Sequence, residues 1–246
     1  DNLSVLHTLF FPRPAKGEQK EMNGTMNWLQ MVDGIGGGVR AVMPNEEGVT
    51  LFPDLKLIPS RAKFLGKGLP GAMVAAGTGS VGEALYADGT RHQVSGWGFP
   101  VGDEGSGAWL GLRAMSHAQE AMDRRLSAGP LATQIHQLCG SHRDALQAWC
   151  ATAGQNEYAQ LAPTVFASAA HDPVAEAVLV EAAAAIERMA TALDPQATLP
   201  LAVCGSVGRQ LLPRLAGATR ARCIASPQDA VHGALTLVHQ SLEQSP

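Results

Sequence analysis

The stretch that decides the fold runs from Gly77 to Gly111 and reads GTGSVGEALYADGTRHQVSGWGFPVGDEGSGAWLG. It holds three glycine-rich turns: GTGS at 77–80, GWG at 96–98 and GDEGS at 102–106. Glycine lets the backbone approach a ligand closely, so that N–H groups can point at phosphate oxygens. An aspartate between glycines can accept hydrogen bonds from sugar hydroxyls. Phosphate donors and hydroxyl acceptors this close together indicate phosphoryl transfer to a sugar.

Short apolar segments around the first of these turns predict strands at residues 72–76, 81–87 and 91–95. Asp88-Gly89, between the second and the third, is the signal of a tight hairpin. The three segments therefore predict an antiparallel meander. Before it, prolines interrupt the apolar segments of residues 1–60, which we expect to be irregular.

A helical pattern follows the meander. Apolar residues at helical spacing, with caps and first-turn prolines, predict helices at 106–126, 130–139, 143–151, 157–170 and 172–193. Next come a buried-type strand at 199–204, a glycine turn, a helix to 215, a strand at 222–225 and a helix at 228–240. This order predicts an α/β protein with a mixed sheet, as in the ribonuclease-H-like half of the actin/sugar-kinase fold.

Composition excludes several classes of function. A net charge of −4 without a basic stripe argues against nucleic-acid binding. No apolar run is long enough to span a bilayer, and no secretory leader is expected. The four cysteines are scattered and the eight histidines lack metal-ligand spacing, so we predict no metal site and a cytoplasmic location.

The chain resembles the N-acetylglucosamine/glucosamine kinase group of the sugar kinase, heat-shock protein and actin superfamily. That group includes the activator ATPases of benzoyl-CoA reductase and 2-hydroxyacyl-CoA dehydratase. The three glycine turns at their spacing carry the resemblance, together with the Gly205-Ser206-Val207 turn, over roughly residues 64–240. A lone GTGS is a weak signal, but the ordered set is specific.

The resemblance implies ATP-dependent phosphorylation of N-acetylglucosamine or glucosamine with Mg²⁺, and a homodimer as a common assembly. It implies that the phosphates bind at Gly77, Thr78, Gly79 and Ser80. The sugar would bind at Gly96, Trp97 and Asp103, and the adenosine at Gly205, Ser206 and Val207. Catalysis would rest on positioning and electrostatics.

Two parts of the family pattern are altered. The first phosphate loop, normally Asp-Gly-Gly-Gly-Thr, has its nearest counterpart at residues 33–39, which read DGIGGGV and lack the threonine. The position of the catalytic aspartate reads Arg61, and a guanidinium cannot act as a base at neutral pH. The catalytic residue is therefore unassigned and activity is in question. We expect an incomplete N-terminal lobe over residues 1–70 and a complete C-terminal lobe over 71–246.

Alternatives remain open at this point. The preferred explanation of the altered N-terminal part is truncation; the others are a non-catalytic sugar- or nucleotide-binding member, and a substitute base such as Asp54. An activator-type ATPase is a further alternative. Among the site residues, Trp97 could belong to the core, Asp103 could cap the helix that begins near Ser106, and GTGS could be an ordinary turn.

Overall fold

The computed structural model describes residues 28–31, 39–45, 48–52 and 70–225 of the 246-residue chain. In its N-terminal part, β1 (Trp28–Met31), β2 (Val39–Asn45) and β3 (Gly48–Phe52) form an antiparallel sheet in that order. The expectation of irregular structure is therefore wrong for these segments. The pairing of β1 with β2 extends only to Val42, so Pro44 has a neighbouring strand on one side alone, which is β3. A proline is tolerated in such an edge position, and β2 is therefore not interrupted. The division into two lobes near residue 70 stays a prediction.

A second sheet confirms the predicted meander. Its strands are β4 (Gly71–Ala76), β5 (Ser80–Leu85), β6 (Arg91–Ser95) and β7 (Leu201–Cys204), in the order β6-β5-β4-β7. The three meander strands are antiparallel, and β7 joins the far edge of β4 in parallel. Asp88 closes the β5–β6 hairpin by accepting hydrogen bonds from the N–H and the hydroxyl of Thr90.

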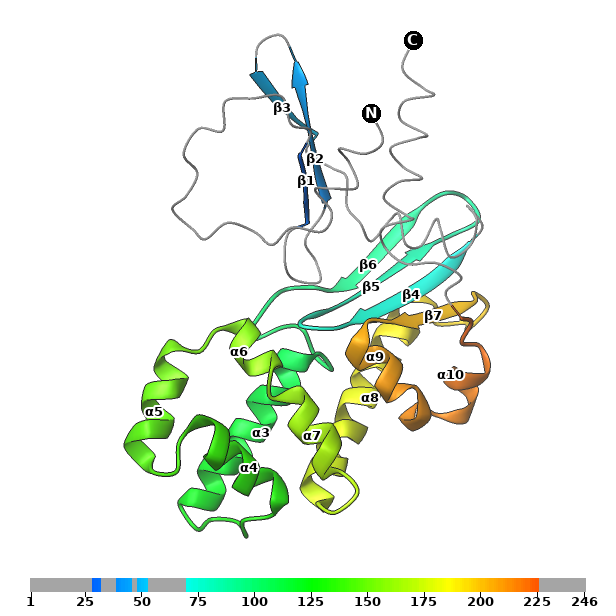
Figure 1. Ribbon diagram of the computed structural model, residues 1–246. Helices are drawn as coiled ribbons and strands as arrows, with labels where there is room; N and C mark the ends of the chain where they lie inside the picture. The colour runs from blue at the N-terminus through cyan, green and yellow to red at the C-terminus, as the bar shows by residue number, and fades with distance from the viewer. Residues whose placement is uncertain (1–27, 32–38, 46–47, 53–69, 226–246) are drawn as a thin grey trace.

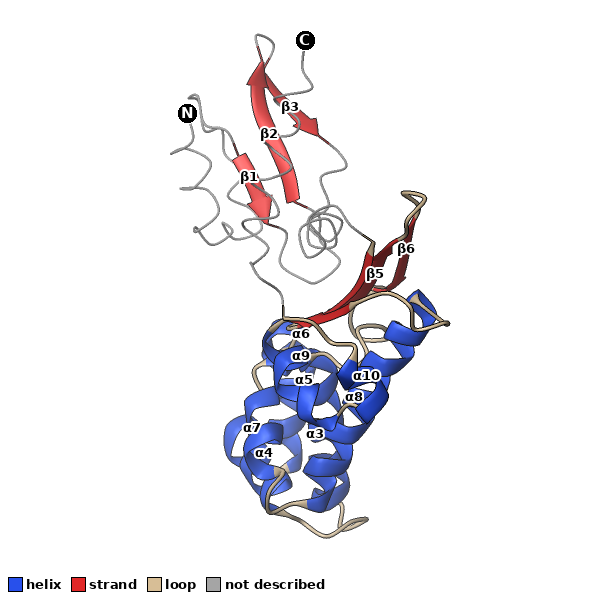
Figure 2. Cartoon of the chain, turned by 90° about the vertical axis from the view of Figure 1, so that its right-hand side faces the viewer, coloured by secondary structure: helices blue, strands red, loops and turns tan. Residues whose placement is uncertain are grey.

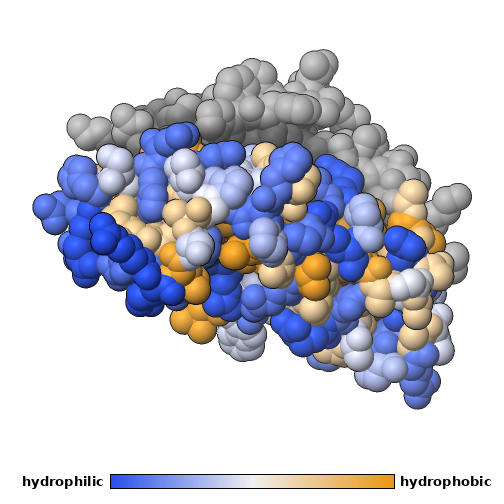
Figure 3. Space-filling model, turned by 90° about the horizontal axis from the view of Figure 1, so that it is seen from below, coloured by the Kyte–Doolittle hydropathy of each residue, from blue (hydrophilic) through white to orange (hydrophobic). Residues whose placement is uncertain are grey.

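Helices cover one face of this sheet (Figures 1 and 2). They are α3 (Gly107–Met122), α4 (Pro130–Cys139), α5 (Arg143–Thr152), α6 (Gln155–Ala159), α7 (Ala162–Ser168), α8 (Pro173–Leu193), α9 (Ser206–Leu211) and α10 (Gly217–Ala221), with a 3₁₀ turn η1 at Leu212–Arg214. The helix α8 packs against β4, β5 and β6, and α3 packs against α4, α6, α7 and α8. Figure 3 shows their lower surface as hydrophilic residues interspersed with small hydrophobic areas. No helix within the described ranges is long and apolar enough to cross a membrane.

Most predicted boundaries are confirmed, with three corrections. The single helix predicted at 157–170 is wrong: α6 and α7 are separated by a turn, and Pro163 stands in the first turn of α7, where a missing N–H costs nothing. The helix α3 ends at Met122, because Arg124 takes a left-handed φ of 59°. The strand predicted at 222–225 is one isolated bridge between Leu201 and Cys223. The helix predicted at 228–240 lies outside the described residues.

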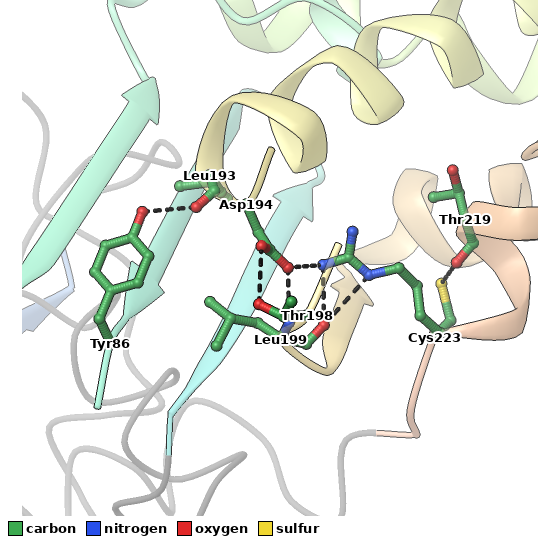
Figure 4. Close-up of polar contacts among 8 residues, drawn as sticks. Tyr86, Leu193, Asp194, Thr198, Leu199, Thr219 and Cys223 are labelled. Atoms are coloured by element: carbon green, nitrogen blue, oxygen red, sulfur yellow. Dashed lines mark hydrogen bonds and ion pairs between the residues drawn. The ribbon is translucent and has the colours of Figure 1, made fainter. Parts of the chain in front are cut away.

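Two contacts bring segments close together. Gly111 on α3 faces the backbone of α6, and a Cβ there would lie 1.9 Å from the carbonyl oxygen of Tyr158. At the amino end of β7, Asp194 accepts hydrogen bonds from the Leu199 N–H and the Thr198 hydroxyl and pairs with the Arg222 guanidinium (Figure 4). This cluster attaches the end of α8 and the segment after α10 to the edge of the sheet.

Candidate functional site

The GTGS turn lies at the carboxyl end of β4, where the first residues of α3 donate hydrogen bonds to its backbone. The carbonyl oxygens of Gly77 and Thr78 accept hydrogen bonds of 2.7 and 3.1 Å from the Gly107 and Ala108 N–H groups of α3. The positive end of α3 thus anchors the turn instead of facing solvent. Within the described residues, the N–H groups of Thr78 and Gly79 donate no hydrogen bond, while Gly77 donates to the Gly79 carbonyl. The turn therefore presents two free backbone donors, as an anion-binding turn does.

The carboxylate of Asp103 lies directly against this turn. A Cβ on Gly79 would come within 2.6 Å of Oδ2 of Asp103, so any larger residue would displace this carboxylate. Asp103 has a left-handed φ of 63° and is buried, with 1% of the residue exposed. The structure therefore brings the first and third glycine turns together, although they are separated by two strands.

The side chain of Gln155, the first residue of α6, fixes one oxygen of that carboxylate. Its Nε2 donates a hydrogen bond of 2.7 Å to Oδ2 of Asp103. Oδ1 is buried and accepts no hydrogen bond of ordinary geometry from the described residues. The cap of α3 is instead Ser106, whose hydroxyl accepts from the Trp109 N–H. The alternative in which the Asp103 side chain caps this helix is therefore wrong.

Burial is the main influence on the ionisation of Asp103 and raises its pKa above the ordinary value. The N–H groups of Ser80 and Gly98 lie near enough to oppose this rise, as does the Gln155 amide, whereas the charge of Glu104 adds to it. Because the opposing donors are neutral, the carboxylate keeps an uncompensated charge when ionised. It is therefore a strong acceptor for a hydroxyl group.

Glu104 ties the three turns to one another. Its carbonyl oxygen accepts from the Ser80 hydroxyl at 2.7 Å, and its carboxylate accepts from the Ser95 hydroxyl at 3.1 Å. Ser80 is buried and makes this internal contact, so its hydroxyl serves the scaffold. Glu104 and Gln155 were both missed as site residues from the sequence.

The GWG turn is a hydrogen-bonded loop that exposes its tryptophan. Gly96 and Gly98 have φ of 73° and 90°, and the Gly102 N–H closes the loop on the Gly98 carbonyl at 2.8 Å. The Trp97 side chain is 89% exposed, so its placement in the core is wrong. A Cβ on Gly102 would lie 2.9 Å from Cβ of Trp97, so the backbone end of the tryptophan side chain adjoins the turn that leads into Asp103.

The Gly205-Ser206-Val207 turn lies next to the GTGS turn. It follows β7, which runs parallel to β4 and pairs with it up to Cys204 opposite Ala75. Ligands of α/β sheets commonly bind at the carboxyl ends of such strands. Ser206 is exposed and begins α9, whereas Val207 is buried. The predicted phosphate and adenosine residues are thus adjacent.

Other predicted features fall outside this description. Residues 33–38, Asp54 and Arg61 lie outside the described residues, so the first phosphate loop and the position of the base stay predictions. Among residues 70–225 and the three N-terminal strands, no cluster of histidine, cysteine and acidic residues could hold a metal ion.

Comparison with known proteins adds sequence evidence. Residues 61–200 match the model of the BadF/BadG/BcrA/BcrD ATPase family. The glucosamine kinase of Vibrio cholerae serotype O1 is 32% identical over 169 residues, which make up 68% of this chain and 57% of that protein.

Solved structures agree with the fold. A crystal structure from Chromobacterium violaceum, provisionally named an N-acetylglucosamine kinase, aligns with a TM-score of 0.72 and 42% identity over 74% of this chain and 64% of that one. A structure from Porphyromonas gingivalis with the same provisional name aligns with a TM-score of 0.56 and 19% identity, covering 65% of its chain, and supports the fold alone. The predicted sugar-kinase type of α/β fold is confirmed. The chain spans less than two thirds of the length of each of these relatives.

Proposed function

The chain belongs to the BadF/BadG/BcrA/BcrD ATPase family, and from this we propose that it transfers the terminal phosphoryl group of ATP to a hydroxyl of an amino sugar, glucosamine or N-acetylglucosamine. One observation carries the proposal. Two backbone donors that are free within the described part of the chain, the Thr78 and Gly79 N–H groups, lie in a turn that adjoins a buried carboxylate, and this combination suits the binding of a phosphate beside a hydroxyl. The names of the similar proteins support the choice of an amino sugar.

The residues of this chain would bind and orient the two substrates. The N–H groups of Thr78 and Gly79 would donate to phosphate oxygens, and the Gly205 turn would border the adenosine. Asp103 would accept a hydrogen bond from a sugar hydroxyl, while the exposed face of Trp97 would pack against the ring. ATP would supply the phosphoryl group, with Mg²⁺ on its phosphates. Holding the two groups in line is the main source of rate in this chemistry.

The residue that accepts the proton of the sugar hydroxyl is unassigned, since Arg61 occupies the position implied by the resemblance. A cytoplasmic location and a homodimer also stay predictions. A non-catalytic sugar-binding protein is the second candidate, and the departure at residue 61 is the observation that favours it.

The test is ADP release by the purified chain with Mg-ATP and glucosamine, N-acetylglucosamine or glucose. Sugar-dependent ADP release is expected with an amino sugar, and its absence with all three overturns the proposed kinase activity. Calorimetric sugar binding without turnover would favour the non-catalytic candidate. ADP release that no sugar stimulates would favour the activator-type ATPase.

A matched pair of variants links the activity to the site. Gly79→Ala places a methyl group 2.6 Å from the Asp103 carboxylate and should lower sugar-dependent turnover by at least about tenfold. Gly71→Ala adds the same methyl group in β4, where its nearest neighbour is 3.7 Å away, and should retain most of the activity. Equal activity of the two variants would contradict the placement of the site.

A further inference from the structure

The contact between Gln155 and Asp103 joins two parts of the chain that are 52 residues apart. Gln155 begins a five-residue helix that is capped at its own start and packs on α3. The Gly154 N–H donates to the Glu157 carboxylate at 2.8 Å. The centroid of the Tyr158 ring lies 5.4 Å from that of the Phe99 ring, and Phe99 belongs to the loop that exposes Trp97. A short helix fixed in this way can hold the amide at a defined position.

The two oxygens of the Asp103 carboxylate have different surroundings. Oδ2 is occupied by the Gln155 amide, whereas Oδ1 is buried and accepts no hydrogen bond of ordinary geometry within the described residues. A buried polar atom without a partner is costly and needs an explanation, such as a ligand absent from the structure. The neutral amide of Gln155 fixes the carboxylate and leaves its negative charge intact. A lysine or an arginine in the same place would neutralise that charge.

We infer that Gln155 is a positioning residue, which holds Oδ2 of Asp103 so that Oδ1 is presented to a hydroxyl of the bound sugar. This inference rests on the proposed function and deepens it, because it assigns part of the sugar affinity to a residue on a separate helix. Gln155 itself need not touch the sugar. Its effect passes through the orientation and the charge of Asp103.

Three variants test this role by equilibrium sugar binding, measured calorimetrically without ATP near pH 6 and near pH 8. Gln155→Ala should bind the sugar about tenfold more weakly at both values, because Asp103 loses its fixed partner. Gln155→Glu should be equally weak near pH 8, where two carboxylates face each other. Gln134→Glu makes the same chemical change on the exposed face of α4 and should bind like the wild type.

The acid variant provides a signature that a purely structural role would not produce. Two carboxyl groups this close share one proton, so protonation near pH 6 turns residue 155 back into a donor toward Asp103. Sugar affinity of Gln155→Glu should therefore recover as pH falls, relative to the wild type measured in parallel. Glu104 is the other acidic group that acts on Asp103, and it is the same in every variant.

The outcomes separate the inference from the proposed function. If the wild type binds sugar while Gln155→Ala binds equally well, or Gln155→Glu follows the wild-type pH profile, the positioning role is overturned and the function stands. If the wild type binds no sugar and also releases no ADP with any of the three sugars, both are overturned. Urea unfolding of Gln155→Glu and Gln134→Glu at the two pH values tests separately whether the carboxyl groups of residues 155 and 103 share a proton. If they do, Gln155→Glu is less stable than Gln134→Glu at the higher pH, where the shared proton is lost.

Discussion

Gly205 and Ala76 lie backbone against backbone at the carboxyl ends of two neighbouring parallel strands. A Cβ on Gly205 would lie 2.0 Å from the carbonyl oxygen of Ala76, and Gly205 has a left-handed φ of 86°. Since β4 and β7 are paired just before this point, the contact sets how closely the GTGS turn approaches the start of α9. Glycine is required at residue 205 both for its conformation and for space.

Gly205→Ala should lower the free energy of unfolding by about 3 kcal/mol or more, since it combines overlap with a backbone carbonyl and an unfavourable φ. Gly217→Ala is the matched control, because no atom of the described residues lies within 4 Å of the added Cβ and alanine favours the helix. Urea denaturation followed by circular dichroism measures both. Similar unfolding midpoints for the two variants would contradict the close contact with Ala76.

Trp97→Ala should separate stability from ligand binding. Trp97 is 89% exposed, so loss of its indole should change the free energy of unfolding by no more than about 0.5 kcal/mol. If the ring packs against the sugar, KM for the amino sugar should rise about tenfold while KM for ATP changes little. A large loss of stability would show that the ring is packed in the folded protein, and an unchanged sugar KM would remove it from the site.

Asp172 should be the most sensitive of the helix caps, because one carboxylate serves two helices. Oδ1 accepts from the Val174 N–H at the start of α8, and Oδ2 accepts from the Leu131 N–H in the first turn of α4, both at 2.9 Å. Asp172→Ala should cost about 2 to 3 kcal/mol and Asp172→Asn about half as much, because the amide has a single acceptor oxygen. Asp144→Ala, an exposed first-turn residue of α5, should cost less than either in the same urea experiment.

Asp194 should make stability depend on pH in the acid range. Burial alone would raise its pKa, but the Leu199 N–H, Thr198 and the Arg222 charge together lower it below the ordinary value. A lowered pKa in the folded state contributes stability at pH values above the unfolded value, and this contribution is lost as pH falls through the folded value. The free energy of unfolding should therefore decrease below about pH 4. Asp194→Asn should be less stable at neutral pH and should lose less on acidification; parallel pH profiles would contradict this assignment.

The meander and the parallel strand behind it were predictable because local signals agree with the tertiary fold. Asp88-Gly89 specifies a hairpin through contacts within three residues. The apolar run of β7, followed directly by a glycine turn, is typical of a buried strand. The resemblance to the amino-sugar kinase group is likewise confirmed, by the family match together with the similar proteins named as glucosamine and N-acetylglucosamine kinases. Residues 157–170 are rich in alanine, which favours helix throughout, and a proline such as Pro163 can be read as a break or as a start, so local sequence does not locate the break between α6 and α7.

The sequence by itself determined the chemistry of the turns, because glycine and aspartate in a given order restrict backbone conformation and hydrogen bonding locally. Only the tertiary structure decided which of these groups meet: that Asp103 lies on Gly79, that Trp97 faces outward, and that Gln155 reaches Asp103 from another helix. The physical reason is that local preference acts over a few residues, whereas these contacts arise from packing helices and strands around a shared core. The sequence pattern near residue 155 does not indicate that Asp103 is its partner, because this contact depends on how α6 packs on α3.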